Sequence, residues 1–262
     1  MKKLLLTTIL VALTLTLFVS SAWAEVQSSL NPSPAVNKGI KNPVAQEEVI
    51  SNLKQRADKE IDRRVTSLTE LITRINGMKK LSSDQKTSLT TQIQTEITAL
   101  NTLKTKIDQD TDLATLRTDV KSIVSSYRVY ALYIPQIRII LASDRISESA
   151  DNLTTLAGKL ESLIGTSGAS GTTLTSLNNY LSDMKAKIAD ANTQALAAQN
   201  EVIALTPQGY PANKTTLQDA RAKIKTAIKD LQAARDDAKQ IIATLRSLKK
   251  PLKATSSAGL EK

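Results

Sequence analysis

The chain has 262 residues with 35 Lys and Arg against 25 Asp and Glu, a formal net charge of +10, and it contains no His and no Cys. This composition excludes disulfides, thiol nucleophiles, histidine general bases and the usual zinc ligands. Aromatic residues make up only 3% of the chain. A core must therefore be built from Leu, Ile, Val and Ala, which suits helices packed side by side.

The first 24 residues have the pattern of a secretory signal peptide. Lys2 and Lys3 precede an apolar stretch over 4–19, and residues 22–24 (AWA) supply a small-x-small cleavage pattern. We expect cleavage after Ala24 and a secreted or periplasmic, extracytoplasmic protein. The mature chain would keep 33 basic and 25 acidic residues, a net charge of +8. The alternative is an uncleaved anchor, but the stretch is short for a bilayer and contains four Thr.

Residues 25–44 contain three prolines, one glycine and few large apolar side chains, so we expect a flexible leader there. From residue 45 onward, apolar residues recur at spacings of three and four, which predicts helices over 45–77 and 83–108. Ser82 and Gln85 stand at the spacing of a capping box before the second of these helices.

The next helical stretch, residues 112–164, contains Pro135. We expect a kink or a break at this proline because it removes one backbone hydrogen bond and clashes with the preceding turn. Residues 165–171 (GTSGASG) predict a flexible loop. The remaining predicted elements are helices over 172–205 and 213–249 and a disordered tail over 251–262.

Short connections between long helices make neighbouring helices antiparallel. The alternation of three- and four-residue spacings also favours close, coiled-coil-like contacts between helices. We therefore predict an all-α fold, an elongated antiparallel bundle of about five long helices over residues 45–250.

The segment over 126–146 is the most unusual part of the sequence. It holds Tyr127, Tyr130, Tyr133 and Arg138 within a nearly continuous apolar run. A helix that is apolar on all sides is typically the surrounded helix of a bundle. Two alternatives remain open: these four residues are a candidate partner contact, or the apolar segment 129–142 enters a membrane on a trigger.

If the segment is only core, Arg138 needs an acidic partner, since an unpaired buried charge is very costly. Asp144 and Asp119 are the candidates. This interpretation therefore predicts that Arg138 forms an ion pair with one of these two residues.

The string SYRVYALYIPQIRIILASDR, with the preceding DTDLATLRTDVKSI, resembles a stretch that recurs in uncharacterised secreted helical proteins of bacteria. The similarity covers about residues 105–165. It implies a bacterial origin and an envelope or extracellular location. No activity is known for that family, so the resemblance assigns no functional residue.

Basic residues gather near the end of the chain, where residues 213–262 hold 12 Lys or Arg against 5 Asp or Glu. Such a ridge attracts anionic surfaces such as lipid head groups or envelope polymers. The alternative is a solvated face that keeps the bundle soluble. We do not expect nucleic acid as the partner, since no aromatic residues interleave the basic ones. The candidate contacts are Arg221, Lys225, Lys229, Lys239, Arg246, Lys249, Lys250 and Lys253.

We expect no catalytic residues, no cofactor and no metal. Asp108, Asp110 and Asp112 alternate as in a calcium loop, but Leu113 and Asp119 stand at its sixth and twelfth positions, where Gly and Glu belong. The predicted function is a non-enzymatic extracytoplasmic scaffold, adaptor or polypeptide-binding protein associated with the cell envelope, without a stable transmembrane span after signal removal. The alternative is a membrane-active helical protein that uses segment 129–142.

Overall fold

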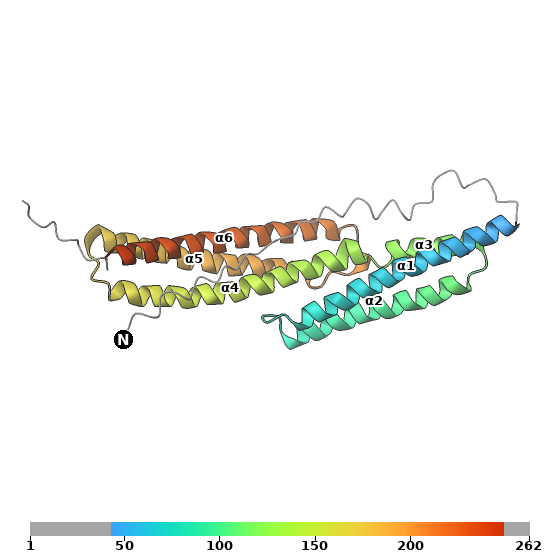
Figure 1. Cartoon of the computed structure of the whole chain (residues 1–262), viewed down its shortest axis with the longest axis horizontal. Coiled ribbons are helices and arrows are strands. Elements are labelled where there is room, and N and C mark those ends of the chain that lie inside the picture. Colours follow the sequence, from blue (N-terminus) through green and yellow to red (C-terminus); the bar gives the residue numbers. More distant parts are fainter. Residues whose placement is uncertain (1–42, 249–262) are drawn as a thin grey trace, which may run out of the picture. The chain divides into compact units, whose positions relative to one another are not determined.

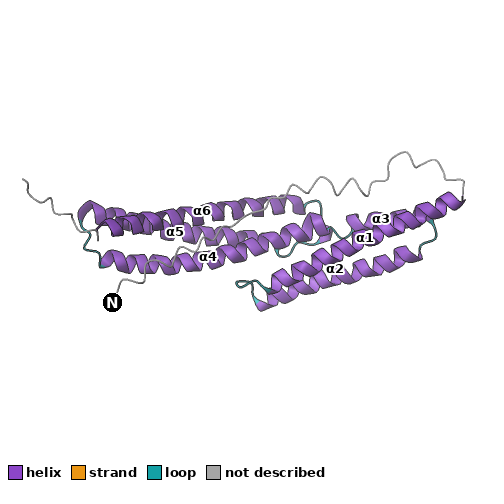
Figure 2. Cartoon of the chain, in the orientation of Figure 1, coloured by secondary structure: helices purple, strands orange, loops and turns teal. Residues whose placement is uncertain are grey.

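The computed structural model describes residues 43–248. The predicted signal peptide, nearly all of the predicted leader and the predicted tail lie outside these residues. The chain divides into two units, residues 1–47 and 48–262. In the first unit the structure describes only residues 43–47, which begin a helix that continues into the second unit. The fold is therefore that of the second unit. Within the described range the chain forms helices and loops and no strand (Figure 2).

Six α-helices and two short helical turns follow one another along the described residues (Figure 1). The predicted all-α bundle is confirmed, with five of the helices between 27 and 36 residues long. The elements are α1 (Pro43–Asn76), α2 (Ser83–Gln109), α3 (Leu113–Ser125), a π-helical turn (Val129–Tyr133), α4 (Ile134–Gly165), α5 (Gly171–Val202), a 3₁₀ turn (Pro207–Gly209) and α6 (Asn213–Leu248).

Side chains at the helix starts show why the chain turns where it does. The backbone N–H of Gln85 donates to Ser82 Oγ at 3.2 Å, and the N–H of Ser82 donates to Gln85 Oε1 at 3.1 Å, which completes the capping box of α2. Asp112 caps α3 by accepting from the Thr115 N–H at 2.7 Å. The hydrogen bonds that Asp112 accepts from the Thr115 N–H and the Thr115 hydroxyl lower the pKa of its carboxyl group. The acidic turn between α2 and α3 thus contains a helix cap.

Helices α4, α5 and α6 pack side by side (Figure 1). In α5, in α6 and in α4 from Ile146 onward, the buried positions alternate by four and three residues, the repeat of a coiled coil. Alanines occupy many of these positions in α5 and α6, and their small size lets the two helices approach closely. The buried alanines are Ala191, Ala195 and Ala198 in α5 and Ala220, Ala227, Ala234 and Ala238 in α6.

The first half of α4 is buried on almost all sides, as expected for a surrounded helix. Gln136, which is fully buried, donates from Nε2 to the carbonyl of Val202 at 2.7 Å, at the end of α5. Asp144 instead accepts hydrogen bonds from the turn between α1 and α2. The N-terminal part of α4 therefore contacts two groups of helices, α1 to α3 on the one hand and α5 with α6 on the other.

The helical stretch over 112–164 is interrupted, as expected for a chain with Pro135, but the interruption lies a few residues before this proline. After the end of α3 at Ser125, Arg128 adopts a left-handed conformation (φ 49°, ψ 28°), and the π-helical turn then leads into α4. Pro135 lies in the first turn of α4. A proline is tolerated there because its missing N–H is one of those that lack an intrahelical partner at a helix start.

Candidate functional site

The predicted tyrosine contact is mostly an internal one. Tyr133 is 1% exposed, and its hydroxyl donates to Glu96 Oε1 at 2.9 Å. Tyr127 is half-buried and donates to the carbonyl oxygen of Ala99 at 3.1 Å. Both bonds run to α2. These two tyrosines therefore attach the segment to its neighbouring helix.

Tyr130 makes the corresponding contact with α1. The guanidinium groups of Arg63 and Arg64 each lie 4.9 Å from the centre of its ring, within the range of a cation–π interaction. Glu60 binds both arginines through its carboxylate, at 2.6 Å in the case of Arg63. Arg64 is only 3% exposed, so this ion pair and the ring together compensate its buried charge.

Burial controls the electrostatics of the Glu96–Tyr133 pair. Desolvation raises the pKa of Glu96, and the hydrogen bond from Tyr133 partly opposes this increase. Desolvation and the nearby carboxylate together raise the pKa of Tyr133. The hydroxyl is consequently a stable hydrogen-bond donor at neutral pH.

The predicted ion pair of Arg138 is wrong. Arg138 is exposed, while the neighbouring Ile137 and Ile139 are buried. Asp144 is occupied by backbone N–H groups, and Asp119 binds Lys106 at 2.9 Å. The apolar helix keeps a narrow outward stripe, and Arg138 lies in this stripe, where it needs no buried partner.

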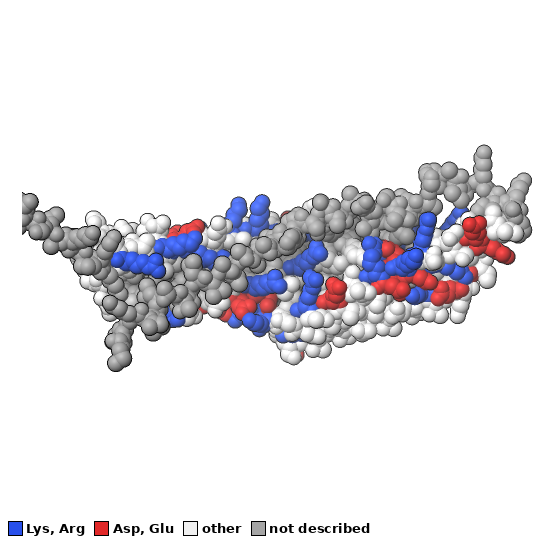
Figure 3. Space-filling view, viewed as in Figure 1, with Lys and Arg blue, Asp and Glu red and all other residues white. Residues whose placement is uncertain are grey.

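Five of the predicted basic contacts form an exposed set on α6, which we call the α6 basic face. Its members are Arg221, Lys225, Lys229, Lys239 and Arg246. Lys225 and Lys229 lie one helical turn apart and have no ion pair within residues 43–248, whereas Lys239 binds Asp236 at 2.7 Å. Figure 3 shows basic side chains along this part of the bundle. The other three predicted contacts, Lys249, Lys250 and Lys253, lie outside the described residues.

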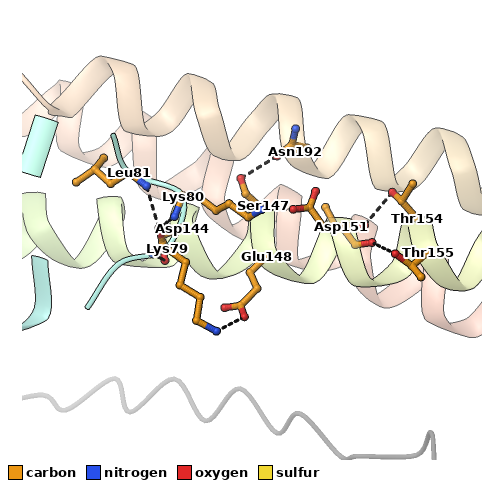
Figure 4. A network of polar contacts seen from close by, with 11 residues as sticks. Lys79, Lys80, Leu81, Asp144, Ser147, Glu148, Asp151, Thr154, Thr155 and Asn192 are labelled. Carbon is orange, nitrogen blue, oxygen red and sulfur yellow. Dashed lines mark hydrogen bonds and ion pairs between the residues drawn. The ribbon is translucent and has the colours of Figure 1, made fainter. Parts of the chain in front are cut away.

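A contact that the sequence reasoning missed joins α4 to the turn between α1 and α2 (Figure 4). The Asp144 carboxylate accepts hydrogen bonds from the backbone N–H groups of Lys79 (3.0 Å), Lys80 (2.5 Å) and Leu81 (3.2 Å). Asp144 is 3% exposed. We call these three bonds the Asp144 clasp.

Two ion pairs flank the Asp144 clasp. Lys79 binds Glu148 at 2.5 Å, and Lys80 binds Asp151. Asp144, Glu148 and Asp151 are spaced four and three residues apart, so they share one face of α4. This spacing opposite a Lys-Lys pair was the available sequence signal, but nothing in the sequence indicates which turn α4 contacts.

An open hollow of about 360 Å³ lies beside the Asp144 clasp. Residues from the end of α1, the following turn and α4 contribute to it. Its lining consists of Arg74, Gly77, Lys79, Leu141, Asp144, Arg145 and Glu148.

Two further properties concern metals and membranes. Among residues 43–248, no group of three Asp or Glu side chains is arranged to hold a metal ion. None of the helices in the described part of the chain combines the length and apolar character needed to cross a bilayer.

No known protein family, curated protein or solved structure matches this chain. The resemblance of residues 105–165 to uncharacterised secreted bacterial proteins therefore stays a prediction.

Proposed function

We propose that this protein is a non-enzymatic, extracytoplasmic helical scaffold or adaptor of the cell envelope, held at an anionic surface by the α6 basic face. The observation that carries the proposal is the placement of this face. The buried seven-residue repeat of α6 turns one side of the helix toward α4 and α5, and its exposed basic residues point to solvent.

Electrostatics makes this face suitable for reversible attachment. A Lys or Arg close to an anionic membrane surface contributes about 1 kcal/mol, and several of them act together. The attraction extends over roughly a Debye length, about 10 Å at 0.1 M salt, so it weakens as salt rises. Attachment through α6 requires no bilayer-spanning helix and leaves the bundle core intact.

Vesicle co-sedimentation tests the proposal. The full chain should pellet at low salt with vesicles of phosphatidylcholine and phosphatidylglycerol, stay in solution with phosphatidylcholine alone, and be released as salt rises. The triple variant K225Q/K229Q/R246Q should bind at least about tenfold more weakly at low salt, because it loses three charges of the face.

The matched control is K59Q/K121Q/K159Q. It removes the same charge from exposed positions on α1, α3 and α4. Equal weakening in both triple variants would show that only net charge matters. Binding of the unmodified chain that is independent of salt and lipid charge would also contradict the proposal.

The alternative, entry of segment 129–142 into a membrane, has less support. Most of its large apolar residues are core, and Val129, Leu132, Ile137 and Ile140 are at most 1% exposed. Releasing them would dismantle the contacts of α4 with both of its neighbouring groups of helices.

A further inference from the structure

The hollow beside the Asp144 clasp brings together two arginines from different helices. Arg74 comes from the last turn of α1, and Arg145 comes from α4. Leu141, one turn before Arg145, adds a half-buried apolar surface to the same hollow. The site thus combines two cationic donors with one apolar contact.

The other charged groups of the hollow are already satisfied. Lys79 is bound by Glu148 at 2.5 Å, and the oxygens of Asp144 accept three backbone N–H groups. Arg145 is exposed and has no ion pair within the described range.

Only a weak ion pair would compete with an incoming anion for Arg74. Its contact with Glu70 is 3.8 Å long, and half of the Arg74 side chain is exposed to solvent. An exposed pair of this kind contributes little. The two guanidinium groups are therefore the available positive charge of the hollow.

We propose that this hollow binds the carboxylate of a small organic acid that carries an apolar group. Arg74 and Arg145 hold the carboxylate, and the apolar group packs on Leu141. Guanidinium donors match the planar geometry of a carboxylate and can bind both of its oxygens. The volume of the hollow falls at the small end of the range typical of small-molecule sites.

The remaining charges favour a monoanion over a phosphate dianion. Asp144 and Glu148 line the same hollow. The C-terminal end of α1 also carries partial negative charge from its last carbonyl groups. A second negative charge on the ligand would be opposed by these groups. Either a free acid or the C-terminal carboxylate of a polypeptide supplies the required chemistry.

A ligand pair that differs only in charge gives the sharpest test. N-acetylleucine and N-acetylleucinamide share the apolar body, but only the first carries a carboxylate. Titration of the full chain, followed through the NMR signals of the ligand, should show binding of the acid and at least about tenfold weaker binding of the amide. R74Q and R145Q should each weaken binding of the acid by about tenfold or more.

R56Q is the matched control, since Arg56 is an exposed arginine of α1 that does not line the hollow. Circular dichroism verifies that each variant folds, and R145K provides a second variant, which keeps the charge but loses the planar fork and should bind with intermediate affinity. Equal binding of acid and amide, no binding of either, or equal effects of R145Q and R56Q would overturn the proposal.

A tripeptide distinguishes the two sources of the carboxylate. N-acetyl-Ala-Ala-Leu binding more tightly than N-acetylleucine would support a polypeptide C-terminus as the natural ligand. Weaker binding of the tripeptide would support a free small acid. None of the lining residues belongs to α6, so failure at this site leaves the vesicle experiment unaffected, and the reverse also holds.

Discussion

At the scale of single residues, buried polar groups decide how the helices are joined. Asp144 is the clearest example, because a buried carboxylate is tolerated only when several donors replace its lost water. Three consecutive backbone N–H groups do so here. The side chain in turn fixes the turn between α1 and α2 against α4.

We predict that Asp144→Ala lowers the free energy of unfolding by about 2–4 kcal/mol, because it leaves three N–H groups at the turn without their acceptor. Urea unfolding followed by circular dichroism measures the change. Asp151→Ala is the control. It removes an acidic residue two turns further along α4, in an exposed ion pair with Lys80, and should change stability little. A similar small effect of both substitutions would contradict a special role for Asp144.

A second residue-scale prediction concerns pH. Because burial raises the pKa of Glu96, its carboxyl group keeps a proton in the folded protein at pH values where the unfolded chain has already lost it. This protonation contributes to the free energy of unfolding at pH values below the ordinary pKa of Glu, about 4.3. The contribution is lost as the pH rises through the higher pKa that Glu96 has in the folded protein. Tyr133 limits this loss, since its hydrogen bond favours the charged carboxylate.

Tyr133→Phe should therefore destabilise the protein by about 1–2 kcal/mol at neutral pH, and less at about pH 4, where Glu96 is largely protonated. Urea unfolding at the two pH values measures the difference. Tyr180→Phe serves as the control because Tyr180 is on the surface of α5. The same loss at both pH values would show that the hydrogen bond does not depend on the charge of Glu96.

At the scale of elements, the sequence predicts the helices well because one physical signal, the spacing of apolar residues, determines both their type and their length. The predicted and observed bounds of α1, α2, α5 and α6 differ by only a few residues. The capping box at Ser82 and Gln85 is also visible in the sequence, since both of its partners lie within one turn.

The position of the break before α4 could not be predicted in the same way. Left-handed positions are usually occupied by glycine, as at Gly168 in the loop after α4 and at Gly171, the first residue of α5. Arg128 gives no such signal, and its conformation is accompanied by a tertiary contact, the stacking of its guanidinium over the Tyr210 ring at 4.5 Å. Pro135 gives a strong signal but lies in a turn that accommodates it. The Asp144 clasp was missed for a related reason, because its partners are more than 60 residues apart.

At the scale of the whole second unit, the N-terminal half of α4 is a core shared by two groups of helices. Tyr133, in the π-helical turn directly before α4, bonds to α2, and Asp144 bonds to the turn after α1. Gln136 and Ser147 connect α4 to α5. Removing packing from this half should therefore weaken both groups together. A core shared in this way predicts a single cooperative unfolding transition rather than two.

Ile140→Ala tests this prediction, since Ile140 is fully buried within the shared half of α4. The substitution should lower the free energy of unfolding by about 2–5 kcal/mol, through lost burial and the cavity left behind. Tyrosine fluorescence, to which the three tyrosines of the segment contribute, and far-ultraviolet circular dichroism, which reports on all helices, should shift to lower urea by the same amount. If the fluorescence transition moved while most of the helical signal remained in place, the two groups of helices would be separate folding units, and α4 would be a linker between them rather than their common core.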